Sequence, residues 1–242
     1  MNELLLLLPT FLIVSAMYAS VGHGGASGYL AIMALASIPV VMMKPTALTL
    51  NLVVSLLGTI LFYKAGHFAW RLFWMFAVVS IPFAYLGGKT NVPPGVFNLL
   101  VAAALVFATV RLFGSVKDQQ IEKQPPIWAI IIAGASIGFF SGLIGVGGGI
   151  FLTPLLLIFG WATIKTAAAV SAPFIFVNSA AGLLGYQTVA ENLIPHWPYY
   201  AVTVVIGGLI GARWGSSLAN PVHLRPVLAG VLVLAIVKLV VS

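Results

Sequence analysis

Ten apolar runs follow one another along this chain, and they constrain its fold more than any other feature of the sequence. Short polar segments separate them, and none of the runs contains Asp or Glu. A helix needs roughly 20 apolar residues to cross a bilayer, or somewhat fewer when neighbouring helices bury its ends. The sequence therefore predicts an all-α polytopic membrane protein. The runs are Leu4–Val21, Tyr29–Met43, Ala47–Tyr63, Leu72–Leu86, Val96–Phe113, Ile127–Ile144, Ile150–Phe159, Ala167–Tyr186, Trp197–Leu209 and Pro226–Val240.

The composition agrees with a chain that lies in a lipid bilayer. Hydrophobic residues make up 61% of it and charged residues only 6%, too few to cover a water-facing surface. The net charge of +7 comes from basic residues scattered singly between apolar runs, which is the pattern of a membrane protein rather than of a nucleic-acid-binding protein. We expect no nucleic-acid partner and no cofactor.

Two glycine-rich runs interrupt the apolar sequence at corresponding places. The first is Gly22-His23-Gly24-Gly25-Ala26-Ser27-Gly28, and the second is Gly145-Val146-Gly147-Gly148-Gly149. Glycine is a poor helix residue with wide conformational freedom, so each run predicts a break in a membrane helix. A helix that resumes after such a break exposes backbone N–H groups, which attract anions.

The two halves of the chain repeat on either side of a polar linker at residues 114–126. The linker holds two of the four acidic residues and two consecutive prolines. Matched positions keep their order and nearly their spacing, which is difficult to obtain by chance. We predict an N-terminal repeat at residues 1–113 and a C-terminal repeat at residues 127–242. Each repeat has a Gly-broken hairpin, either re-entrant or fully spanning, followed by three transmembrane helices. The matches include Gly22 with Gly145, Gly24 with Gly147, Gly25 with Gly148, Lys44 with Lys165 and Tyr63 with Tyr186.

The distribution of Lys and Arg predicts that the two repeats are inverted. An odd number of crossings per half places eight of the 11 basic residues on one face and only Lys44, Lys89 and Lys238 on the other. An even number divides them six against five. Because basic residues concentrate in cytoplasmic loops, the odd number is favoured. The linker is then cytoplasmic, both termini lie outside the cytoplasm, and the halves form inverted repeats, as in many secondary transporters.

Inversion would bring the two breaks together near the midplane, where interrupted helices usually hold substrate. Polar residues inside the runs are further candidates, because a buried amide or hydroxyl needs a partner. The alternative roles are tight packing of helices through small residues, and a hydrogen-bonded packing histidine at position 23. We predict no catalytic and no metal-binding residues. The candidate substrate-binding residues are Gly22, His23, Gly24, Gly25, Ser27, Asn51, Gly145, Gly147, Gly148, Gly149, Thr153, Ser171 and Asn178.

The positions of the acidic residues point to an anion as the solute. All four lie in termini or connections, whereas a cation carrier or a proton relay normally needs a carboxylate within a span. His23 can hydrogen-bond an oxyanion or exchange a proton, so coupling to protons or to another ion is open. Lys44 and Lys165 can draw anions to two mouths, or simply extend to the membrane boundary.

The doubled glycine motif resembles that of the TauE/SafE (TSUP) family of sulfite exporters, and the resemblance covers nearly the whole chain. It rests on Gly22–Ala26 and on a fuller Gly-x-Gly-Gly-Gly-x-x-x-x-Pro run at Gly145–Pro154. Ala26 departs from the pattern, since a third glycine is common there. The resemblance implies transport of sulfite, thiosulfate, sulfonates or related organic anions across a bacterial inner membrane. In such a membrane, the termini that the basic residues place outside the cytoplasm are periplasmic.

Other functions fit parts of the sequence. A passive anion channel would use the same residues as an alternating-access carrier. Gly25-Ala26-Ser27-Gly28 fits the Gly-x-Ser-Gly pattern of intramembrane serine proteases, but a protease would not explain the duplication. A nucleophilic serine also needs a base within hydrogen-bond reach, and His23 is the one histidine inside a hydrophobic segment. A homodimer is compatible with the sequence.

Overall fold

The computed structural model describes residues 2–20, 22–113, 124–186 and 188–217, together with residues 233, 236 and 237. Within these residues all regular structure is helical, which confirms the all-α prediction. Linker residues 114–123 and most of the expected helix Pro226–Val240 lie outside the described part. The helices are α1 (Asn2–Ala19), α2 (Ala26–Leu35), α3 (Val40–Lys64), α4 (Trp70–Lys89), α5 (Pro94–Phe113), α6 (Ile127–Ile144), α7 (Gly149–Ile158), α8 (Ile164–Gly185) and α9 (Trp197–Ser217), with a short 3₁₀ turn at Ala190–Asn192.

Helix length separates two classes of element. Among the described residues, the helices α3, α4, α6 and α8 are long and apolar enough to cross a membrane. By contrast, α2 and α7 have only 10 residues each. At about 1.5 Å per residue they extend about 15 Å, roughly half of a 30 Å hydrocarbon core. Both short helices begin inside a glycine-rich run, α2 at Ala26 and α7 at Gly149.

The expected run Tyr29–Met43 is wrong as a single element. Helix α2 ends at Leu35, and α3 begins at Val40 and continues through Pro45. Proline has no N–H, so it leaves the carbonyl four residues earlier without its helical donor. Here the Tyr186 hydroxyl donates to that Val41 carbonyl at 3.2 Å, so the helix passes the proline intact.

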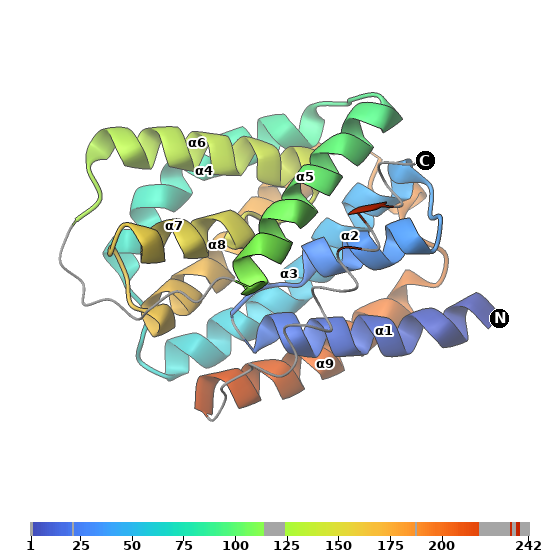
Figure 1. Cartoon of the computed structure of the whole chain (residues 1–242), viewed down its shortest axis with the longest axis horizontal. Helices are drawn as coiled ribbons and strands as arrows, with labels where there is room; N and C mark the ends of the chain where they lie inside the picture. Colours follow the sequence, from blue (N-terminus) through green and yellow to red (C-terminus); the bar gives the residue numbers. More distant parts are fainter. Residues whose placement is uncertain are drawn as a thin grey trace.

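Helices from the two halves of the chain pair with each other. Figure 1 shows α4 beside α6 along one edge of the bundle and α1 beside α9 along the opposite edge. Helices α3 and α8 pack together between these pairs, and α3 also contacts α9 as α8 contacts α4. The short helices α2 and α7 pack on α3 and α8 respectively. Among the described helices, the main contacts between the halves thus form reciprocal pairs, α4 with α6 and α1 with α9, and α4 with α8 and α3 with α9.

The edge pairs approach with backbone against backbone. Gly142 of α6 faces the carbonyl of Ala84 in α4, and Gly211 of α9 faces the carbonyl of Ala16 in α1. A Cβ on either glycine would overlap the facing carbonyl oxygen. Small residues at such crossings are typical of helix association in membranes.

The outer surface of the bundle is apolar, while its interior holds polar side chains. Large apolar side chains face outward, including Val78 at 61%, Ile127 at 74% and Leu184 at 77% exposure. Asn51 and Asn178 are fully buried. This arrangement suits lipid, since a soluble protein would place its polar side chains outside.

Candidate functional site

The two glycine breaks lie side by side, and the side chain of Asn51 joins them. Asn51 is fully buried on α3. Its Oδ1 accepts a hydrogen bond of 3.2 Å from the Ala26 N–H, in the first turn of α2. Its Nδ2 donates a hydrogen bond of 3.1 Å to the Val146 carbonyl in the second break. One amide therefore holds both breaks together.

Two of the three matched glycine pairs share an unusual backbone conformation, whereas in the third pair only Gly147 has a positive φ, at 80°. Gly25 caps α2 with φ of 94°, and Gly148 caps α7 with φ of 83°. Gly22 and Gly145, the first glycine of each run, also have positive φ, at 77° and 91°. Residues with a Cβ rarely adopt this region, so the sequence needs glycine at these four places. The N-cap glycines provide no side chain to cap α2 or α7, and in α2 the Ala26 N–H donates to Asn51 instead.

The glycines inside the breaks are packed closely from behind. A Cβ at Gly147 would lie 2.5 Å from Nδ2 of Asn51 and 2.9 Å from Cγ2 of Ile175. Gly24 meets the same two side chains from the first break, and Gly149 also lies against Ile175. The two breaks therefore enclose Asn51 and Ile175 and leave no space for larger side chains at these positions.

His23 and Thr153 mark the accessible side of the site. They are half-buried, whereas the other candidate residues are buried. Cδ2 of His23 lies 3.7 Å from the position of a Cβ on Gly149, so the first break reaches the start of α7. Thr153 is one turn further along the same face of α7, and its hydroxyl lies 2.7 Å from that of Ser171 on α8. An imidazole, a helix N-terminus and hydroxyls thus gather on one face.

Three other candidate residues, Ser27, Gly25 and Asn178, make their contacts elsewhere. The Ser27 hydroxyl donates to the hydroxyl of Tyr18 on α1 at 2.8 Å, so it is engaged with a phenol rather than with a base. Gly25 lies against the ring of Tyr29. Nδ2 of Asn178 donates to the Phe174 carbonyl of its own helix at 2.8 Å.

Comparison with known proteins identifies the chain. Residues 7–239 match the family described as Sulfite exporter TauE/SafE. The chain belongs to the TauE/SafE family. It is 40% identical over 235 residues to a "Probable membrane transporter protein", y4hK, of Sinorhizobium fredii, covering 95% of each chain. A "Probable membrane transporter protein" of Methanocaldococcus jannaschii is 27% identical over 256 residues, which covers 95% of this chain and 94% of that protein. No solved structure matches the chain.

The family match confirms the resemblance that the doubled glycine motif indicates. With the apolar exterior, it establishes this TauE/SafE protein as a multi-pass membrane transporter. The names of the relatives also indicate transport rather than an enzymatic reaction.

Lys44 of this TauE/SafE protein does not lie at a mouth. It is only 5% exposed, and its ammonium donates to the Gly88 carbonyl at 2.7 Å and to the Gly87 and Thr90 carbonyls at 3.3 Å. These carbonyls end α4, where the helix dipole attracts a cation. Lys165, its match in the second half, is exposed. The two lysines therefore have different environments despite their equivalent positions in the sequence.

Sequence reasoning missed Ser141 and did not select Ser179. Both are fully buried beside the second break. Ser179 Oγ would lie 2.9 Å from a Cβ on Gly147, and Ser141 Cβ would lie 3.5 Å from one on Gly148. A signal was available for Ser141, a polar residue four positions before Gly145 in an otherwise apolar stretch.

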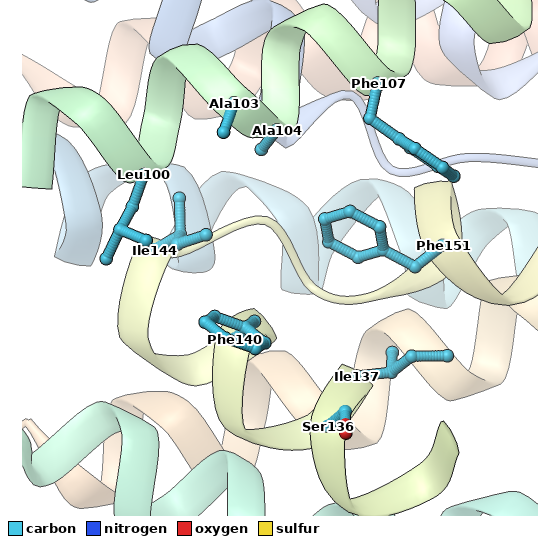
Figure 2. A pocket seen from close by; sticks show the side chains of 9 residues that line it. All are labelled: Leu100, Ala103, Ala104, Phe107, Ser136, Ile137, Phe140, Ile144 and Phe151. Carbon is cyan, nitrogen blue, oxygen red and sulfur yellow. The ribbon is translucent and has the colours of Figure 1, made fainter. Parts of the chain in front are cut away.

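Two cavities in the described part of the chain lie away from the glycine breaks. Figure 2 shows one of about 400 Å³ between α5 and α6, and a second of about 820 Å³ shares part of its wall. Ser136 is the one polar side chain that lines the first cavity. Such a wall gives an anion almost no hydrogen bonds, so we exclude it as the anion site. The first cavity is lined by Leu100, Ala103, Ala104, Phe107, Ser136, Ile137, Phe140, Ile144 and Phe151.

Proposed function

We propose that this TauE/SafE protein is a secondary transporter of small sulfur-containing anions such as sulfite, thiosulfate or sulfonates. One observation carries the proposal: His23 of the first break lies against Gly149 at the start of α7, with Thr153 on the same accessible face. The N-terminus of α7 supplies N–H groups and the positive end of a helix dipole. An imidazole and a hydroxyl add hydrogen bonds to an oxyanion.

We also propose that the halves are inverted repeats in a bacterial inner membrane, with periplasmic termini and a cytoplasmic linker. The reciprocal helix pairs support this relation, because α1 packs on α9 as α6 packs on α4. The matched positive φ values at Gly22 and Gly145, and at Gly25 and Gly148, support it at the level of single residues. Inverted repeats are frequent where two conformations expose one site alternately.

The packing of the breaks favours a carrier over a channel. A channel needs a continuous polar path, whereas Asn51 and Ile175 fill the space between Gly24 and Gly147. The site is accessible at His23 and Thr153 and closed behind them. An anion would therefore cross only when helices move, as alternating access requires.

Counterflow in proteoliposomes tests this function. Vesicles preloaded with unlabelled sulfite should take up labelled sulfite faster than empty vesicles, and thiosulfate and a sulfonate should compete. Gly24→Leu and Gly148→Leu should insert normally but abolish uptake, because their side chains would meet Asn51 and Phe174 respectively. Gly95→Leu is the matched control, since nothing lies within 4 Å of a Cβ there. Normal uptake by both site variants would refute the site, and uptake unaffected by preloading would indicate a channel.

His23→Gln tests whether the imidazole couples transport to protons. Glutamine can still donate a hydrogen bond but does not titrate near neutral pH. If protonation of His23 drives transport, uptake by the variant should vary much less with pH than uptake by the wild type. An unchanged pH profile would remove this role and leave His23 as a hydrogen-bond donor.

A further inference from the structure

Three buried oxygen atoms near the second break have no hydrogen-bond partner among the described residues. They are Oγ of Ser141, Oδ1 of Asn178 and Oγ of Ser179, and all three residues are fully buried. They make up half of the six such side-chain atoms in the described part of the chain. Buried polar groups are almost always paired, so this cluster indicates a bound species.

The three residues flank one crossing of helices. Gly142 of α6 and Gly182 of α8 meet here, with 3.3 Å between Cα of Gly142 and a Cβ on Gly182. Ser141 precedes Gly142 in α6, while Asn178 and Ser179 lie one turn before Gly182 in α8. The two serines also border the adjacent residues Gly148 and Gly147 of the break, as described above. The three side chains therefore belong to one small region.

The donors and acceptors of this region suit a cation better than an anion. Nδ2 of Asn178 is already bonded to the Phe174 carbonyl, so only its oxygen remains available. Exchanging the two amide atoms would place the oxygen against that carbonyl, which is unfavourable. An amide oxygen accepts hydrogen bonds or coordinates a cation, but it repels an anion. The available atom of Asn178 therefore suits a cation better than an anion.

The end of α6 adds a field of the appropriate sign. Helix α6 ends at Ile144 with Gly145 in the left-handed conformation, directly beside Ser141 and Gly142. The Ser141 carbonyl accepts from the N–H groups of Gly145 and Val146, at 2.9 and 3.2 Å, so only the carbonyls that follow it in the last turn lack helical donors. They carry a partial negative charge that attracts a cation by its full charge, whereas a water molecule binds them only through its two O–H donors.

We infer that a sodium ion binds at this crossing, held by the side-chain oxygens of Ser141, Asn178 and Ser179 and by carbonyls at the end of α6. Mg²⁺ and Ca²⁺ usually take carboxylates, and the acidic residue whose side chain the structure describes, Glu191, is exposed. Neutral oxygens and an interrupted helix suit Na⁺. All the proposed ligands are uncharged oxygens.

The second break then presents opposite poles to two ions. The positive end of α7 faces the anion, and the negative end of α6 faces sodium, with only residues 145–148 between the helices. Bound together, the two ions reduce each other's cost of burial. This inference rests on the proposed anion transport, and it makes the protein a sodium-coupled transporter.

Thermal unfolding of the purified full-length protein tests the ion site without any transport. The melting temperature should rise along a NaCl series in which choline chloride keeps the ionic strength constant. Ser141→Ala and Ser179→Ala each remove one ligand oxygen and should raise the sodium concentration needed for half the effect by at least about tenfold. Ser80→Ala is the control, because this buried hydroxyl already donates to the Ala77 carbonyl and should leave the response unchanged.

Labelled sulfite uptake into proteoliposomes tests the coupling. Uptake should depend on external Na⁺ in the wild type and in Ser80→Ala, and Ser179→Ala should need a higher sodium concentration. Equal melting curves in sodium and choline would overturn the ion site, and so would serine variants that shift stability equally in both salts, as a bound water predicts. Equal uptake in both salts would overturn the coupling. A sodium-dependent melting temperature without uptake of any anion would uphold the ion site and refute the transport function instead.

Discussion

Replacing Asn51 should destabilise the protein more than any other single polar substitution at the breaks. Leucine has the same branched shape as asparagine and is somewhat larger, so Asn51→Leu leaves no cavity. It does remove both hydrogen bonds, to the Ala26 N–H at 3.2 Å and to the Val146 carbonyl at 3.1 Å. Ala26 and Val146 are only 2% and 5% exposed, so water does not replace the lost partner. A buried unpaired group costs about 1–3 kcal/mol, so we expect a loss of about 2–6 kcal/mol.

Thermal unfolding in detergent micelles measures this loss. A change of about 1 kcal/mol shifts the melting temperature of a domain of this size by about 2–4 °C, so the variant should melt at least about 4 °C lower. Asn98→Leu is the matched control on α5, because Oδ1 of Asn98 is buried without a partner and its removal should cost little. If Asn51→Leu melts within about 1 °C of the wild type and transports sulfite normally, the breaks are not held together by this amide.

Three further outcomes follow from the same geometry. Lys44→Met should lower the free energy of unfolding by about 1.5–3 kcal/mol, because the end of α4 loses its cation. Lys165→Met, at an exposed site, should lower it by about 0.5 kcal/mol or less. Equal losses in the two variants would contradict the burial of Lys44. Gly148→Ala should cost at least about 1–2 kcal/mol at φ of 83°, against little for Gly95→Ala, and similar melting temperatures would argue against the αL cap. Thr153→Val should raise the KM for sulfite by up to about tenfold, and an unchanged KM would place the anion away from α7.

Most helices could be predicted because each corresponds to a run of apolar residues between polar ones, which is a local feature of the sequence. Ile127–Ile144 is both an expected run and a helix of the structure. The boundary inside Tyr29–Met43 was missed although Ser37 and Pro39 mark it, and Pro39 directly precedes the first residue of α3. The continuation of α3 through Pro45 was not predictable, because the sequence does not show which group satisfies the Val41 carbonyl. The hydroxyl that satisfies Val41 comes from Tyr186, far along the chain.

The candidate site divides in the same way. Glycines that start α2 and α7 are visible in the sequence because their positive φ excludes most other residues. The roles of Asn51 and Lys44 depend on which backbone groups the fold places beside them, and composition carries no information on that. Asn51 is a candidate by burial cost alone, and its place between the two breaks is a property of the tertiary structure. Whether the thirteen residues bind substrate stays a prediction.

The glycine crossings of α4 with α6 and of α1 with α9 have a mechanical consequence. Side chains that interdigitate can change rotamer and let helices slip, but carbonyls seated on glycines have no such freedom. Each pair should therefore move as one rigid body. Sliding of the α4–α6 pair relative to the α1–α9 pair should then occur where α3 packs on α8. Spin labels on α4 and α6 would then report one separation throughout the transport cycle, while labels on α3 and α8 would report two.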